Sequence, residues 1–118
     1  MSSESAKIVG APISTRRGGG RFTLAVGGRW VGYLNWMYLA PYKLYIGDLL
    51  IRREEDRLKG YGRMLVDHFE RSARSKGFTR VHLFMVASES LPFWRRLGYV
   101  GRYSKPGEEG GGFYKDLG

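Results

Sequence analysis

The stretch Arg57-Leu58-Lys59-Gly60-Tyr61-Gly62 lies between an apolar run and an amphipathic segment. The run before it, residues 44–51, predicts a buried strand, and the residues from Tyr61 to about Lys76 predict a helix. A Gly-rich turn that opens a helix presents unpaired backbone N–H groups and the positive end of the helix dipole at one place. Its glycines let the backbone approach a ligand closely, and its basic side chains add positive charge. The stretch therefore predicts a phosphate-binding site.

Two common phosphate-binding motifs do not fit this stretch. A nucleotide-binding P-loop needs a Lys-Ser/Thr pair after its second glycine, and no such pair follows Gly62. A Rossmann motif needs a third glycine, an early βαβ position and an acid after the next strand, and none of these is present. The stretch instead resembles the signature of the GNAT acetyltransferase superfamily, Arg/Gln-x-x-Gly-x-Gly/Ala. Arg57, Gly60 and Gly62 hold its three defining places.

The flanking sequence extends this resemblance from about residue 20 to the end of the chain. Before the loop, Asp48-Leu49-Leu50-Ile51 is similar to the family's strand of one acid followed by apolar residues. After the loop, a predicted strand at Val81–Ala87 and the ending Phe93-Trp94-Arg95-Arg96-Leu97-Gly98-Tyr99 resemble the family's next strand and short helix. Upstream, residues 26–33 resemble its early hairpin.

The sequence pattern predicts strands first, then helices alternating with further strands. The predicted strands are Ile8–Ser14, Arg21–Val26, Trp30–Leu39, Lys43–Arg52, Val81–Ala87, Tyr99–Ser104 and Gly112–Leu117, and the predicted helices run from Tyr61 to about Lys76 and from Pro92 to Gly98. The resemblance implies an α+β fold, with a mixed, mostly antiparallel sheet of six or seven strands and two helices after the fourth strand. Residues 14–21 form only a turn, so the helices that the family usually carries near its N-terminus are missing. We expect one domain over residues 1–118, with residues 1–7 as a mobile tail.

The composition is basic and contains no cysteine. The chain has 20 Lys and Arg against 11 Asp and Glu, a net charge of +9, which favours polyanionic partners. Coenzyme A accounts for part of this excess, and a nucleic-acid surface is the alternative for the rest. Without cysteine there are no disulfides, thiolate nucleophiles or Cys-based zinc sites, and we expect no metal centre. A signal peptide and a membrane-spanning run are both absent from the sequence, so we expect a cytoplasmic protein without membrane contact.

The resemblance implies acetyl-CoA as the cofactor. In the family, the backbone of the strand before the loop binds the pantetheine arm and polarises the thioester carbonyl, and the loop amides hold the pyrophosphate. Ser88 and Ser90 stand near the place where relatives often have an Asn that touches the cofactor. The residues assigned to the cofactor in this way are Leu49, Leu50, Ile51, Arg57, Leu58, Lys59, Gly60, Tyr61, Gly62, Arg63, Ser88, Ser90 and Trp94.

Two positions depart from the family pattern. Many relatives have a Tyr in the second helix that protonates the departing thiolate, and its place, three residues before Leu97, holds Trp94. The indole N–H is a donor without useful acidity. The strand position where some relatives keep a catalytic Glu holds Phe84. These two residues favour an alternative function, a CoA-binding or nucleic-acid-binding module without catalysis.

Few residues are candidates for acid–base chemistry. Asp48, at the mouth of the cofactor strand, is the first choice as general base, and the alternative is a strand-edge carboxylate paired with an arginine. Glu89 is a second candidate base, and Tyr99 or Tyr103 is a candidate for the missing acid.

Other polar residues have a structural interpretation. The residues predicted to be solvated or at element boundaries are His68, His82, the turn Glu54-Glu55-Asp56, and Asp67, Glu70, Arg71 and Arg74 on the outer face of the first helix.

The leading functional hypothesis is an acetyl-CoA-dependent N-acetyltransferase in which an amine attacks the thioester directly within a ternary complex. The basic surface and the groove left open by the missing helices favour a macromolecular amine, on a protein lysine, a protein N-terminus, nucleic acid or tRNA. A cationic polyamine would be repelled. A homodimer that completes the groove is also considered. A third hypothesis, a small basic RNA-binding fold, predicts no affinity for CoA.

Overall fold

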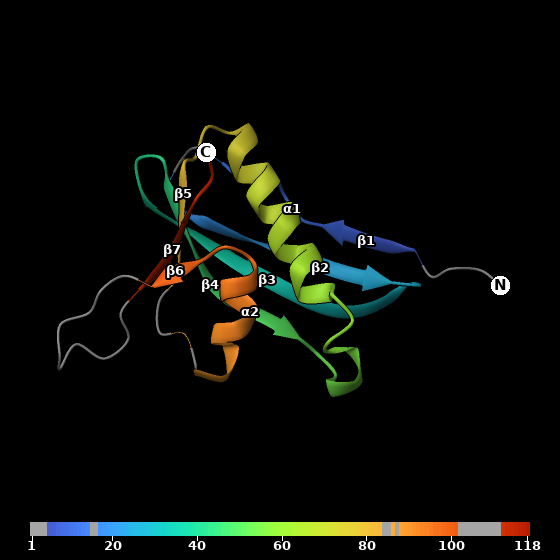
Figure 1. Ribbon diagram of the computed structural model, residues 1–118. Helices are drawn as coiled ribbons and strands as arrows, with labels where there is room; N and C mark the ends of the chain where they lie inside the picture. The colour runs from blue at the N-terminus through green and yellow to red at the C-terminus, as the bar shows by residue number, and fades with distance from the viewer. Residues whose placement is uncertain (1–4, 15–16, 84–85, 87, 102–111) are drawn as a thin grey trace.

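A β-sheet forms the body of the protein, and both α-helices lie against one of its faces (Figure 1). The computed structural model describes residues 5–14, 17–83, 86, 88–101 and 112–118. In these residues the elements are β1 (Ala6–Val9), β2 (Gly19–Val26), β3 (Arg29–Ala40), β4 (Lys43–Ile51), the 3-10 helix η1 (Glu54–Asp56), α1 (Tyr61–Ser75), β5 (Arg80–Leu83), the 3-10 helix η2 (Ser88–Ser90), α2 (Leu91–Arg96), β6 (Val100–Gly101) and β7 (Phe113–Asp116).

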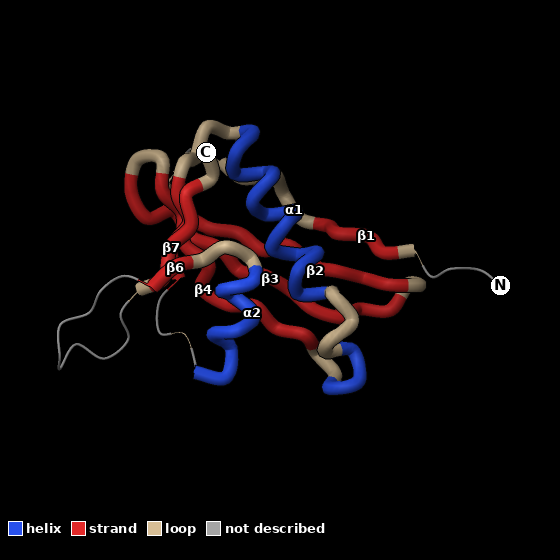
Figure 2. The backbone as a smooth tube through the Cα atoms, viewed as in Figure 1, coloured by secondary structure: helices blue, strands red, loops and turns tan. Residues whose placement is uncertain are grey.

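The described strands form one sheet in the order β1-β2-β3-β4-β5-β7-β6 (Figure 2). Neighbouring strands are antiparallel except β4 and β5, which are parallel. This arrangement confirms the predicted α+β fold, with a mixed, mostly antiparallel sheet and both α-helices after the fourth strand. The described residues between β1 and β2 contain no helix.

The structure corrects the predicted boundaries of the first strand. Ala6–Val9 pairs with Thr23–Val26, so residues 6 and 7 belong to the sheet and not to a tail. The predicted strand over Ile8–Ser14 is wrong beyond Val9, because the pairing with β2 ends there. The last residues of the strands predicted at Val81–Ala87 and Tyr99–Ser104 lie partly outside the described residues.

The core lies between the sheet and the helices. Alternate residues of β2, among them Phe22 and Leu24, are buried, and the β2–β3 hairpin closes through Gly27 and Gly28 at positive φ, as its sequence predicts. On α1 the buried apolar residues are Leu65, Val66, Phe69 and Ala73.

Both α-helices end in a Schellman motif, which turns the next aromatic residue into the core. After α1, the N–H of Gly77 donates to the Arg74 carbonyl at 3.0 Å and that of Phe78 to the Ala73 carbonyl at 3.0 Å. After α2, Gly98 and Tyr99 repeat the pattern on the carbonyls of Arg95 and Trp94. Glycine suits both turns because φ is 86° at Gly77 and 94° at Gly98.

Candidate active site

A cleft lies beside the second half of β4, next to the described end of β5. Their parallel ladder runs from Lys43 opposite Arg80 to Ile46 opposite Leu83. At that point β4 carries a β-bulge, because Asp48 pairs with Asn35 and Ile46 with Trp36, which leaves Gly47 as an extra residue. From Gly47 onward, β4 pairs only with β3 in the described part of the chain. Since successive amides of a strand point to opposite edges, alternate amides of this segment face the cleft.

The cleft has a volume of about 940 Å³ and is lined by the second half of β4, the end of β5, the loop before α1, and α2. It contains most of the residues that the sequence assigns to the cofactor or to catalysis. Those that line it are Asp48, Leu49, Leu50, Ile51, Arg57, Leu58, Gly60, Tyr61, Gly62, Arg63, Glu89, Ser90 and Trp94. Lys59 and Tyr99 do not line it, and the side chain of Ser88 lies outside the described part.

The loop before α1 has the geometry of an anion-binding site. Gly60 is the N-cap of α1 with φ 82°, and no side chain caps the helix start. The first N–H group with an intrahelical partner is that of Met64, which donates to the Gly60 carbonyl at 3.0 Å. The amides of residues 61–63 are therefore available to a ligand, and the first turn contains no acidic residue that would repel an anion.

The two loop glycines serve different purposes. A Cβ added at Gly60 would meet nothing within 4 Å, so Gly60 is needed for its positive φ and opens onto free space. A Cβ at Gly62 would lie 3.2 Å from the Phe93 ring and 3.7 Å from Leu49. Gly62 therefore lets the start of α1 approach α2 and β4 closely.

In the acidic turn before the loop, Glu54 and Glu55 are exposed as predicted, whereas Asp56 is buried and is not solvated. Asp56 is 1% exposed and accepts hydrogen bonds from both terminal nitrogens of Arg29, at 2.6 and 3.1 Å. The Lys59 ammonium lies 3.5 Å from the same carboxylate, so Lys59 pairs with Asp56. The hydrogen bonds from Arg29 lower the pKa of Asp56, although burial opposes them. Local sequence patterns do not predict this ion pair, because Arg29 and Asp56 are 27 residues apart.

Asp48 lies at the edge of the cleft and is exposed. Its carboxylate accepts a long hydrogen bond of 3.4 Å from the Asn35 amide, and the Asn35 oxygen accepts one of 2.7 Å from Arg21. Arg21 thus contacts Asn35 and not Asp48 directly. This arrangement lies between the two predicted alternatives, a general base and a carboxylate paired with an arginine. Glu89 lines the cleft from η2.

Tyr99 is not placed to act as the catalytic acid. It is 1% exposed, and its hydroxyl donates a hydrogen bond of 2.9 Å to Glu70, away from the cleft. Burial, together with the Glu70 carboxylate, raises the pKa of Tyr99 far above its ordinary value. Glu70 itself is 3% exposed and also pairs with Lys115 at 2.8 Å, so its predicted place on the solvent face of α1 is wrong. Tyr103 and Phe84 lie outside the described residues.

The indole ring of Trp94 forms part of the cleft wall and packs against two other aromatic rings. Its indole is 7% exposed and meets the rings of Phe93 and Tyr99 edge to face, at 4.9 and 5.2 Å between centroids. Trp94 lines the cleft, and its assignment to the cofactor stays a prediction.

Neither histidine lines the cleft. His82 is 7% exposed in β5, so its predicted boundary or surface position is wrong. The register places it between Tyr45 and Tyr114. His68 packs edge to face on Phe22 at 4.8 Å, and partial burial lowers its pKa.

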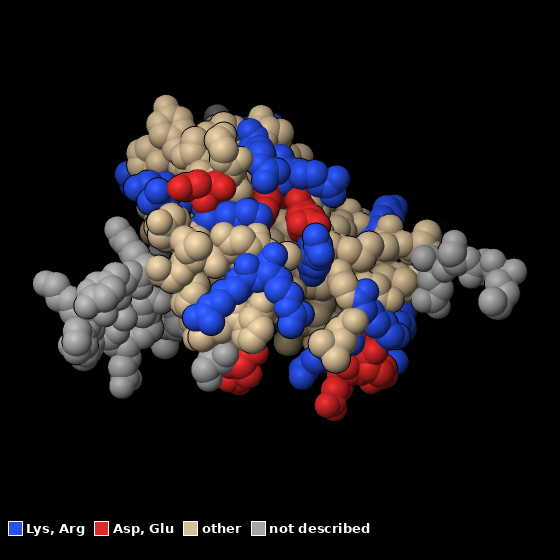
Figure 3. Space-filling model, viewed as in Figure 1, with Lys and Arg blue, Asp and Glu red and all other residues tan. Residues whose placement is uncertain are grey.

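Basic side chains gather over α2 and beside the start of α1, around the cleft (Figure 3). These include Arg95 and Arg96 in the last turn of α2, and Arg57 and Arg63 on the cleft wall. The cleft thus combines free helix-start amides with a positive surface, which suits a phosphorylated ligand. Neither α-helix of the described residues is long and apolar enough to span a membrane.

The cleft beside β4 ends at an uncapped, Gly-rich helix start, which is the kind of anion site that a CoA-dependent acyltransferase needs. The sequence matches the family described as "Acetyltransferase (GNAT) family" over residues 4–99, and the chain belongs to this family.

Solved structures share the fold at low sequence identity. The IAA acetyltransferase from Bacillus cereus ATCC 14579 is similar with a TM-score of 0.76 and 18% identity, covering 95% of this chain and 99% of that one. The PaiA N-acetyltransferase from Thermoplasma acidophilum, in complex with coenzyme A, is similar with a TM-score of 0.71 and 16% identity, over 81% of this chain and 59% of that one. The N-acetylglutamate synthase from Neisseria gonorrhoeae is similar with a TM-score of 0.69 and 17% identity, over 83% of this chain and 26% of that one. No curated protein sequence matches the chain.

Proposed function

We propose that the protein is an acetyl-CoA-dependent N-acetyltransferase that transfers the acetyl group directly to an amine on a macromolecule. The observation that carries the proposal is the cleft that runs along the second half of β4 to the available amides at the start of α1. The open space at Gly60 and the absence of acidic residues from the first turn of α1 fit a diphosphate.

The residues present fit the cofactor along the whole cleft. The amides of Gly60, Tyr61, Gly62 and Arg63 would hold the pyrophosphate, with Arg57 as an additional cation. The free amides of β4 at Leu49–Ile51 would bond the pantetheine arm, and Trp94 would pack against it. Bound acetyl-CoA supplies an acetyl thioester, whose carbonyl oxygen a β4 amide can polarise.

The amine must be neutral to attack, and Asp48 is our candidate for the group that takes its proton. Asn35 holds this carboxylate at the cleft edge, and Glu89 is the alternative base. Because Trp94 has no useful acidity and Tyr99 is engaged with Glu70, we propose that water entering the open cleft supplies a proton to the leaving group.

The uncovered sheet face beside the cleft supports a large acceptor molecule. Without helices between β1 and β2 in the described residues, the cleft mouth at Asp48 adjoins an uncovered sheet face. A large acceptor can reach such a mouth, and the net charge of +9 disfavours small polycations.

Calorimetric titration with acetyl-CoA, followed by thiol release in the presence of peptide, protein and nucleic-acid amines, tests the proposal. We expect binding and release of the CoA thiol with at least one macromolecular acceptor. Absence of CoA binding would overturn the proposal. Tight CoA binding without thiol release from any acceptor would instead establish the second candidate, an inactive CoA-binding module, which the indole of Trp94 favours.

A further inference from the structure

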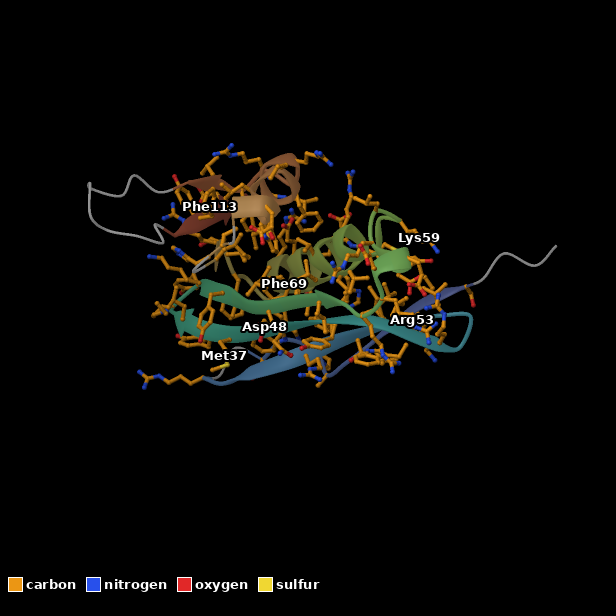
Figure 4. All side chains as sticks on the ribbon, turned by 90° about the horizontal axis from the view of Figure 1, so that it is seen from below. Met37, Asp48, Arg53, Lys59, Phe69 and Phe113 are labelled. Atoms are coloured by element: carbon orange, nitrogen blue, oxygen red, sulfur yellow. The ribbon has the colours of Figure 1, made fainter. Side chains whose placement is uncertain are left out.

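The sheet face turned away from both α-helices carries an organised set of polar and aromatic side chains. Figure 4 shows Met37 on this side and Phe69 between α1 and the sheet. Along β2 and β3 the residues alternate, so that Phe22 and Leu34 enter the core while Arg21 and Tyr33 lie on the outer face. Neither α-helix of the described residues covers this face.

One part of the outer face is a stack of two rings, with an arginine against each ring. Arg52 lies over the Trp30 ring at 4.8 Å from its centroid. Trp30 stacks on Tyr33 with 6.2 Å between ring centroids and only 4° between planes. Arg21 lies over the Tyr33 ring at 4.0 Å from its centroid. Both arginines are exposed, so each presents its guanidinium group to solvent.

A second row crosses the sheet beside the first. The strand register aligns Met37 with Tyr45, Tyr45 with His82, and His82 with Tyr114, and His82 is buried between the two tyrosines. Arg80 lies over the Tyr114 ring at 4.5 Å and is held there by a hydrogen bond of 2.7 Å to Asp116. This row, like the stack, therefore combines rings with an arginine.

Between the two rows lies the pair of Asn35 and Asp48, at the mouth of the cleft. Exposed apolar side chains, including Met37 at 43% and Leu50 at 39%, fill the space around them. The face is thus continuous with the candidate active site and is neither purely apolar nor purely charged.

We infer that this face binds a single-stranded nucleic acid. Bases stack on guanidinium planes as well as on aromatic rings, and arginines neutralise the phosphates. Because Trp30 and Tyr33 stack on each other, the exposed guanidinium groups of Arg21 and Arg52 are the surfaces on which bases would stack. A second copy of the chain fits less well, because it would bring the same arginines of two proteins of charge +9 together. The inference concerns binding and does not depend on acetyl transfer.

Fluorescence anisotropy tests the inference with labelled single-stranded RNA and DNA of roughly 20 nucleotides, longer than one binding site of this kind. The variants are Trp30→Ala and Arg21→Ala, and the matched control is Arg71→Ala. Arg71 is an exposed residue of α1, so its substitution removes the same charge from the helix-covered side of the sheet. Titration with CoA checks separately that each variant keeps its cleft.

We expect Trp30→Ala and Arg21→Ala to weaken binding of single strands about fivefold or more, and Arg71→Ala by less than about twofold. A duplex and heparin, which offer phosphate or sulfate without accessible bases, should bind more weakly than the single strand. The inference is overturned if no single strand binds, or if heparin binds as tightly and all three variants behave alike. It is also overturned if sedimentation shows a dimer that Trp30→Ala dissociates while nucleic-acid affinity stays unchanged.

Discussion

Arg29 donates two hydrogen bonds to Asp56, at 2.6 and 3.1 Å, and this pair joins the β2–β3 hairpin to the loop that opens α1. Asp56 is almost fully buried, and Lys59 adds a second cation at 3.5 Å. The Asp56 carboxylate therefore holds in place the loop that presents amides to the cleft, and its main partner, Arg29, comes from β3. Asp56 is a positioning residue in this arrangement.

Replacing Asp56 with Asn should lower both the stability and the CoA affinity, because the Arg29 guanidinium loses its counter-charge. The folded-state pKa of Asp56 is below its ordinary value of 3.8. Its contribution to stability is therefore fully present above that value and is lost as pH falls through the folded-state pKa. Urea unfolding of both proteins should show a gap near about pH 7 that narrows in acid. Glu55→Gln, at an exposed neighbouring carboxylate, serves as control and should show no gap.

Gly60→Asp should weaken CoA binding at least about tenfold relative to Gly60→Asn. Asp and Asn have nearly the same shape and both tolerate the left-handed backbone at φ 82°. They differ in one negative charge at the start of α1, where the pyrophosphate would lie. Calorimetry gives the affinities, and thermal unfolding confirms that the two variants are equally stable. Equal affinities of the two variants for CoA would show that the pyrophosphate does not bind at this loop.

Gly62→Ala should cost about 1–3 kcal/mol of stability and also reduce CoA affinity. The new Cβ would lie 3.2 Å from the Phe93 ring, so α2 has to move away from the start of α1. Phe93→Leu makes room, and the double variant should recover part of the loss. A double-mutant cycle measured by urea unfolding checks this coupling, and strict additivity would count against the contact.

Tyr99→Phe should destabilise the fold by about 1–3 kcal/mol, because Glu70 loses a buried hydrogen-bond donor. Turnover by the folded variant should stay within about twofold of the wild type. Thermal unfolding and thiol-release kinetics measure the two effects separately. A large drop in kcat with unchanged stability would restore Tyr99 as the catalytic acid.

Much of the fold and cleft is predictable because its signals are local in the sequence. Residues 57–62 identify the helix start, and the apolar run before them identifies β4 as its neighbour. What sequence patterns miss are partners that meet only in the folded protein. Asp56 and Arg29 are 27 residues apart, and Glu70 and Lys115 are 45 apart. Helical periodicity places Glu70 on the solvent face, whereas β7 brings a lysine that allows its burial.

Asp48→Asn should lower kcat far more than it changes the affinity for CoA, by about a hundredfold if the carboxylate takes the proton of the amine. The defect should shrink as pH rises, because the acceptor amine then loses its proton to solvent. Asn keeps the size of the side chain and can still meet Asn35, so the cleft edge stays intact. Glu89→Gln tests the alternative base in the same cleft, and its kcat should change little if Asp48 takes the proton. Thiol-release rates over a range of pH decide the matter. A pH-independent defect, or a larger loss with Glu89→Gln, would transfer the role of base away from Asp48.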